Sequence, residues 1–232
     1  MTAPDAAFDA AFYFDLASPD AYLAAERILH VLPGPAEWQP VLASELSGPS
    51  SYAALRCEAE LQAFRENAAR RAAALGLQPL RWPSPFPFDS SLAMRVATYA
   101  KSIGRAVPFA QAAFRQAFAG GRSLAEPDNV LIAAAACEMH PAAVLRGAEL
   151  RSMHEQLSAA TALAAQAGVS DVPAVRVGEQ VFVGERSLQQ AAASMREMMS
   201  RAGSDPVAAA ANPAPADAAP TNTAPTNPAP AR

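Results

Sequence analysis

The sequence predicts an α/β fold in which a small β-sheet is interrupted by a long block of helices. Short apolar runs rich in aromatic or β-branched residues occur near both ends of the folded part, at residues 11–16 and 174–183. Between them, apolar side chains recur at helical spacing over a long stretch. Residues 203–232 differ from both, because they repeat TNxAP-like segments and hold no aromatic side chain.

The composition excludes several classes of protein. The chain has 232 residues, 51% of them hydrophobic, and a formal net charge of -4, which fits one domain or two small ones without a broad basic surface for nucleic acid. No uncharged apolar run is long enough to span a membrane. The acidic start does not resemble a signal peptide, so we expect a cytoplasmic protein. Two distant cysteines and three scattered histidines indicate neither a dithiol nor a metal site.

The N-terminal part predicts a β-α-β unit. Ala11–Leu16 (AFYFDL) is predicted to be a strand. Ser18 then suits a helix cap and is followed by proline, so a helix is expected over Pro19–His30. Glu37–Ala43 is the second predicted strand, and Pro40 places it at a sheet edge.

A helical block follows. Apolar side chains at helical spacing predict a long helix over Tyr52–Leu75, which Gly76 ends. Gln78–Phe88 holds four prolines and is expected to be a loop. Five further helices are predicted at Ser90–Ile103, Phe109–Ala119, Pro127–Glu138, Pro141–Glu149 and Ser152–Ala167.

The last folded part predicts a hairpin and a helix. Ala174–Val177 and Gln180–Val183 flank Gly178-Glu179, a pair that suits a type II′-like turn, and an amphipathic helix is expected over Ser187–Arg201. This order is thioredoxin-like, so we expect a thioredoxin-like domain (residues 10–48 and 151–202) and a helical insertion domain (residues 49–150). The remainder (residues 203–232) is expected to be a disordered Ala/Pro-rich tail. A Pro-rich ligand for a partner domain is the alternative for the tail.

Two positions stand where a thioredoxin-like fold carries its chemistry. The turn after the first strand holds Ser18, whose hydroxyl can donate a hydrogen bond to a bound thiolate but cannot exchange disulfides. The alternative is an ordinary helix cap. Val172-Pro173 opens the strand before the hairpin, and a cis bond there would leave the Val172 backbone free for an extended ligand. The alternative is a simple strand-start proline.

Four segments together resemble one known family. They are FYFDLASPDAYL at residues 12–23, FPFDS with the following AMR at 86–95, GVSDVP at 168–173, and FVG at 182–184. They are similar to motifs of the 2-hydroxychromene-2-carboxylate isomerase family, the bacterial relatives of kappa-class glutathione transferases. That family is DsbA-like, with a thioredoxin fold interrupted by a helical domain, and the resemblance covers roughly residues 10–200.

The resemblance implies a glutathione-dependent isomerase or transferase that acts on a small, aromatic, electrophilic substrate. Ser18 would be the catalytic residue that holds the glutathione sulfur as a thiolate. Glutathione binding is expected from Pro19, Asp20, Pro49, Val172, Pro173, Glu185 and Arg186. A substrate pocket is expected from Trp82, Phe86, Phe88, Asp89 and Arg95. An apolar wall between domains is the alternative for the aromatic residues, and a salt bridge is the alternative for Arg95.

Three polar positions depart from the family pattern. Arg186 stands where the family has the acid that grips the γ-glutamyl ammonium, Asp89 replaces an asparagine, and Gly48-Pro49 replaces Gly-Asn. An active glutathione enzyme should therefore recover the ammonium contact elsewhere. The alternative function is a redox-inactive thioredoxin-fold module that binds thiols or peptides without turnover. A dithiol oxidoreductase is disfavoured because no CxxC motif is present, and a homodimer is left open.

Overall fold

The computed structural model describes residues 9–48 and 57–204. Its centre is a four-stranded sheet of order β2-β1-β3-β4. β1 (Ala10–Phe14) pairs in parallel with β2 (Glu37–Pro40) and antiparallel with β3 (Ala174–Val177), which forms a hairpin with β4 (Gln180–Val183). This topology confirms the predicted thioredoxin-like fold with inserted helices.

Side chains that alternate along the strands give the sheet two buried faces. Phe12 and Phe14 of β1 are fully buried in a cluster with α1 (Pro19–Ala25), α2 (Ile28–Val31) and α9 (Ser187–Ser204). Ala11 and Tyr13 point to the other face and pack against α8 (Arg151–Gln166). Full burial of each phenylalanine side chain stabilises the fold by about 1.5–3 kcal/mol. β1 thus contributes side chains to the hydrophobic cores on both faces of the sheet.

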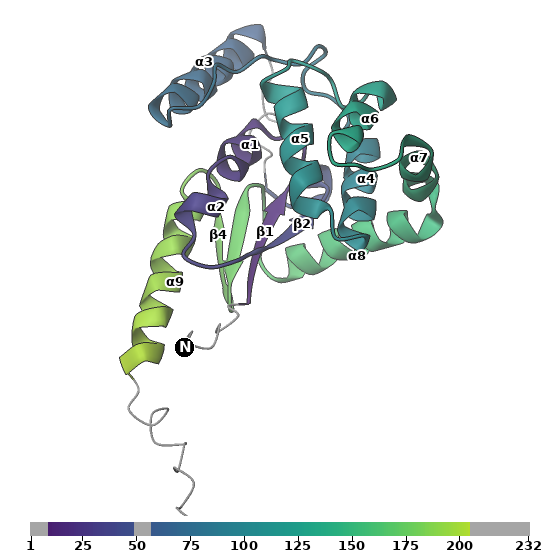
Figure 1. Cartoon of the computed structure of the whole chain (residues 1–232). Coiled ribbons are helices and arrows are strands. Elements are labelled where there is room, and N and C mark those ends of the chain that lie inside the picture. Colours follow the sequence, from purple (N-terminus) through teal and green to yellow (C-terminus); the bar gives the residue numbers. More distant parts are fainter. Residues whose placement is uncertain (1–8, 49–56, 205–232) are drawn as a thin grey trace, which may run out of the picture.

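The inserted helices pack together beside the sheet, except for α3 (Glu58–Ala74), which lies apart from them (Figure 1). α4 (Ser91–Ser102) packs on α5 (Ala106–Phe118), α7 (Pro141–Glu149) and α8, and α6 (Pro127–Ala135) packs on α5. α3 (Glu58–Ala74) lies over the end of α1, and the buried residues of this helix are Ala68 and Ala72. α3 is therefore held by fewer apolar contacts than the helices around α4.

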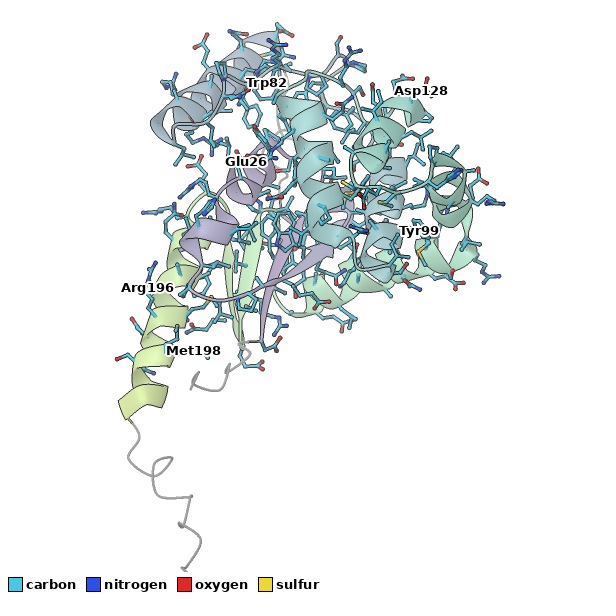
Figure 2. All side chains as sticks on the ribbon, viewed as in Figure 1. Glu26, Trp82, Tyr99, Asp128, Arg196 and Met198 are labelled. Carbon is cyan, nitrogen blue, oxygen red and sulfur yellow. The ribbon has the colours of Figure 1, made fainter. Side chains whose placement is uncertain are left out.

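A row of aromatic rings joins the sheet to α3. Phe14 contacts Phe114, and Tyr22 contacts both Phe114 and Phe118 of α5. Further rings continue the row, where Trp82 packs against Phe118 on one side and against Phe64 of α3 on the other. Figure 2 shows Trp82 between α3 and the near end of α5.

The prediction of one helix over Pro19–His30 was wrong, because the structure has two helices there. α1 ends at Ala25 and α2 begins at Ile28. The Arg27 N–H donates to the carbonyl of Ala24, three residues back, and the Arg27 φ angle of -116° departs from helical values. The tighter turn breaks the helix there.

Other element boundaries differ by a few residues. β1 ends at Phe14, and the chain then turns, with the Ser18 N–H donating to the Asp15 carbonyl and the Ala17 N–H to the Asp15 carboxylate. α5 begins at Ala106 rather than Phe109, since Pro108 falls in its first turn, where the missing N–H breaks no helical bond. The strand after Glu37 ends at Pro40, on the edge of the sheet as predicted. The turn has a positive φ at Gly178, which suits the type II′-like prediction.

Three predictions fall at least partly outside the described residues. They are the start of the long helix at residues 52–56, the glutathione contact at Pro49, and the tail from residue 205 onward. The described part of the long helix begins at Glu58, and α9 continues to Ser204 instead of ending at Arg201.

Candidate functional site

Ser18 forms the N-cap of α1, directly after the first strand. Its Oγ accepts a hydrogen bond from the Ala21 N–H at 3.2 Å, and Pro19 takes the first helical position. The side chain of Ser18 is buried, at 1% exposure. Within the described part of the chain, the Ser18 hydroxyl donates no hydrogen bond. The hydroxyl is therefore a cap, as the simpler interpretation predicted, and still has a proton to donate.

Asp15 fixes the turn that carries Ser18. Its Oδ1 accepts from the Ala17 N–H at 2.9 Å, and its Oδ2 accepts from the Ala43 N–H at 3.0 Å. Burial raises the pKa of Asp15, and hydrogen bonds from Ala17, Ala43 and the Ser90 hydroxyl act against that rise. This role of Asp15 was not predicted from the sequence, although an acid at the end of an apolar strand is a signal for it.

Val172-Pro173 has a cis peptide bond, as predicted. The Val172 N–H donates to Oδ1 of the neighbouring Asp171 at 2.7 Å, and the Pro173 carbonyl accepts from the Gly184 N–H at 2.8 Å. The N–H expected to be free for a ligand is thus occupied by a side chain of the same loop. Burial raises the pKa of Asp171, and the charges of Asp20 and Asp15 add to that rise.

Gly48 holds the loop after β2 against the same region. Its N–H donates to the Ser170 carbonyl at 2.7 Å, and a Cβ atom on Gly48 would lie 2.3 Å from that carbonyl oxygen. No real side chain fits at that distance. The glycine therefore allows the loop to approach residue 170 next to Val172.

Arg71 of α3 joins two residues predicted to bind glutathione. Its guanidinium forms an ion pair with Asp20 in the first turn of α1, and its Nη1 lies 2.5 Å from Oε1 of Glu185 in the loop after β4. Arg186, the residue that stands where the family has an acid, is exposed. Arg71 was not predicted from the sequence, because no local pattern distinguishes it from the other arginines of this polar helix.

A cavity of about 220 Å³ lies where α1, α3 and α9 meet. Its apolar lining is Leu23, Ala24, Ala74, Leu75 and Leu188. Its charged lining is Asp20, Arg27, Arg71, Glu185 and Arg186. Next to it, Ser187 in the first turn of α9 is fully buried, and its Oγ has no hydrogen-bond partner among the described residues. A buried hydroxyl without a partner is unusual, because leaving it unpaired costs about 1–3 kcal/mol.

The five residues predicted to form a substrate pocket do not line this cavity. Trp82 and Phe86 pack edge to face, with ring centroids 4.9 Å apart, and both contact Phe64 and Phe118. Phe88 is buried in the main core. The rings of Trp82 and Phe86 thus pack between Phe64 of α3 and Phe118 of α5.

Asp89 and Arg95 lie at the start of α4. The Asp89 Oδ1 accepts from the N–H of Ser91 at 2.9 Å and from its hydroxyl at 2.5 Å. These hydrogen bonds lower the pKa of Asp89, and the charge of Arg95 contributes. The Arg95 Nε is buried without a partner among the described residues.

Within the described residues, the cysteines and acids do not form a second candidate site. Cys57 precedes α3 and is exposed, Cys137 follows α6 and is buried, and both are free thiols. Within residues 9–48 and 57–204, no group of three or more metal-ligating side chains comes together. No helix in those ranges has the length and hydropathy needed to cross a lipid bilayer.

The sheet order, the cis proline and the serine at the start of α1 define a thioredoxin-fold protein with a hydroxyl at the position of a reactive thiol. The chain belongs to the family of DsbA-like thioredoxin domains, which matches residues 11–196. No curated protein matches the sequence.

Solved structures show the same fold at low sequence identity. A 2-hydroxychromene-2-carboxylate isomerase is 17% identical with a TM-score of 0.73, over 84% of this chain and 97% of its own. A probable DsbA oxidoreductase from Streptomyces coelicolor is 17% identical with a TM-score of 0.69, over 83% and 90%. The cytosolic disulfide reductase DsbM from Pseudomonas aeruginosa, with GSH, is 14% identical with a TM-score of 0.58, over 84% and 99%.

Proposed function

We propose that the protein is a glutathione-dependent isomerase or transferase that acts on a small, aromatic, electrophilic substrate in the cytoplasm. The observation that carries this proposal is Ser18, which follows the first strand and keeps an uncommitted O–H proton among the described residues. Because no thiol stands there, the site is suited to holding the thiolate of a ligand rather than to exchanging disulfides.

The Ser18 hydroxyl would donate its hydrogen bond to the glutathione sulfur. Its burial would strengthen that bond, because the surroundings compete less than water. A sulfur reaches the hydroxyl only if the side chains that cover it move aside. Asp15 does not contact the ligand in this scheme and instead holds the turn in which Ser18 lies.

Two further parts of the site fit a small peptide-like thiol. The Val172 carbonyl can accept a backbone hydrogen bond from the ligand, whereas the Val172 N–H is already bonded to Asp171. The unpaired Ser187 hydroxyl lies in the first turn of α9, where N–H groups without helical partners also lie. A ligand carboxylate would satisfy both kinds of donor.

Bound glutathione would supply a thiolate that adds to an electrophilic carbon of the substrate. In an isomerase the same thiolate is later expelled, whereas in a transferase the sulfur stays and another group, such as chloride, leaves. The residues of this chain would orient the sulfur and lower its pKa by hydrogen bonding. We include Trp82, Phe86 and Arg95 in the proposal as residues near the aromatic substrate. The Arg95 Nε without a partner is the observation that favours a carboxylate there.

A redox-inactive module that binds thiols or peptides without turnover is the second candidate. Arg186 favours it, because this exposed arginine stands where the resemblance places the acid that would bind the γ-glutamyl ammonium group.

Calorimetric titration of the full chain with glutathione tests the proposal, followed by an assay with 1-chloro-2,4-dinitrobenzene as aromatic electrophile. We expect binding with a millimolar or lower Kd, and turnover that is lost in Ser18→Ala. Binding without turnover of any aromatic electrophile would support the module. If glutathione does not bind at 10 mM, neither the glutathione-dependent enzyme nor a module that binds glutathione is supported.

A further inference from the structure

We infer that Arg71 determines ligand specificity at the candidate glutathione site, because it provides the cation that a ligand's ammonium group would otherwise provide. The inference rests on the proposed function and names the class of thiol that the site accepts. That class is a low-molecular-weight thiol that the protein recognises through its carboxylates. Its α-amino group makes no specific contact with the protein.

The position of Arg71 is the first argument. One guanidinium pairs with Asp20 from α1 and with Glu185 from the loop after β4. Both carboxylates line the same cavity as Arg186, which stands where the family pattern has its acid. The Asp20 side chain is 10% exposed and the Arg71 side chain 21% exposed. Their pair is therefore largely removed from water, and a ligand cation that displaced Arg71 would have to replace a desolvated contact.

The surrounding charge is the second argument. The cavity next to this pair is lined by three arginines (Arg27, Arg71 and Arg186) and by two carboxylates, so its lining has an excess of positive charge. The Arg27 guanidinium lies 2.6 Å from the side-chain amide of Gln189, a neutral partner that leaves the charge of Arg27 in place. A carboxylate is attracted to such a lining, whereas an ammonium group gains nothing from it.

The way α3 is held is the third argument. Phe64 anchors the middle of α3 to the aromatic row, and Arg71 lies near its C-terminal end. Removal of Arg71 thus leaves the aromatic anchor in place. The same removal takes the Arg71 ion pair away from Asp20 and Glu185, whose carboxylates could then pair with an ammonium group. A single substitution should therefore change what the site recognises.

The test compares glutathione with N-acetylglutathione, which keeps the thiol and both carboxylates but carries no ammonium charge. In calorimetric titrations of the full chain at pH 7.5, we expect the two Kd values to agree within about threefold, as for an ion pair that is not formed. Tighter binding of glutathione by about tenfold or more would overturn the inference, since a charge-assisted hydrogen bond to the ammonium has that effect. If neither compound binds, the proposed function and this inference both fail.

Arg71→Gln sharpens the test. Loss of the internal cation should make glutathione bind about tenfold more tightly than its acetylated form. Arg71→Lys keeps the charge and should keep the wild-type ratio. Arg70→Gln is the matched control, because Arg70 is the neighbouring, exposed arginine of the same helix, and it should leave the ratio unchanged. An equal change in both glutamine variants would overturn the inference, and the wild-type comparison decides even if Arg71→Gln does not fold.

Discussion

The two sides of the candidate site are held by different kinds of interaction. On the Ser18 side, the buried Asp15 carboxylate accepts backbone N–H groups from two separate loops. On the Arg71 side, ion pairs between long side chains join α3 to α1 and to the loop after β4, and the Glu185 partner is 55% exposed.

This difference suggests that the Ser18 side contributes to stability and that the Arg71 side contributes to ligand recognition. Hydrogen bonds from buried backbone groups cannot be replaced by water, so the Ser18 side should be lost only together with the fold. On the Arg71 side, the ion pair with the exposed Glu185 exchanges partners with salt at little cost, whereas the ion pair with Asp20 is largely buried. We therefore expect substitutions on the first side to change stability and substitutions on the second side to change recognition.

The largest effect is expected from Asp15→Ala. The change leaves the N–H groups of Ala17 and Ala43 buried without acceptors and should lower the unfolding free energy by about 2–4 kcal/mol. Urea denaturation measures it. Asp128→Ala is the control, because Asp128 is an exposed acid in the first turn of α6, and its loss should cost at most about 1 kcal/mol. If both variants lose the same unfolding free energy, Asp15 does not stabilise the Ser18 side in the way described.

The pH dependence of stability should reveal the same carboxyl. Burial raises the pKa of Asp15 above its ordinary value of 3.8, so folding takes up a proton in the pH range above that value. The contribution of Asp15 to stability is then greatest at low pH and decreases as the pH rises through the pKa of the folded state. Asp15→Asn cannot ionise and should lack this decrease. Unfolding free energies between pH 4 and 7 test it, and parallel curves would contradict the assignment.

Ser18→Ala should have an intermediate effect. Loss of the cap to Ala21 should cost about 1 kcal/mol of stability. If Ser18 also holds a thiolate, the pKa of bound glutathione should rise by about one to two units, because a hydrogen bond to a charged group contributes about 1.5–3 kcal/mol. Ultraviolet thiolate absorbance against pH measures the shift, and Ser158→Ala on the surface of α8 is the control. An unchanged titration would leave Ser18 as a helix cap alone.

The smallest effect on stability is expected from Glu185→Gln. The Glu185 carboxylate is more than half exposed, so its pair with Arg71 should contribute below about 0.5 kcal/mol, and 0.5 M salt should remove that difference. Thermal unfolding at two salt concentrations measures it. A large loss that persists at high salt would show that the Arg71 side belongs to the scaffold as well.

Much of the fold was predictable because its signals are local. The aromatic run that became β1, the glycine turn of the hairpin and the prolines that begin helices each act over a few residues. The division of the first helix at Arg27 was not predictable, since its residues have no breaker and the turn depends on a single backbone bond to Ala24.

The candidate site was predictable only in part. Ser18 and Val172-Pro173 stand in motifs that can be read along the chain. Arg71 pairs with residues that lie on two other elements, and such a pairing exists only once the chain has folded. Asp171 could have been noticed as an acid before the proline, but its bond to the Val172 N–H depends on the loop geometry.

The pairing of β1 with β3 has a consequence for protein synthesis. Tyr13 lies opposite Ala174, so about 160 residues must be made after β1 before its second neighbour exists, which takes roughly 8–32 s at ribosomal rates. Until then β1 can pair with β2, and its other edge is an open template for foreign strands. The inserted helices, which pack mainly on one another, can fold during this interval. The newly made chain is therefore most prone to aggregation before residue 174 leaves the ribosome.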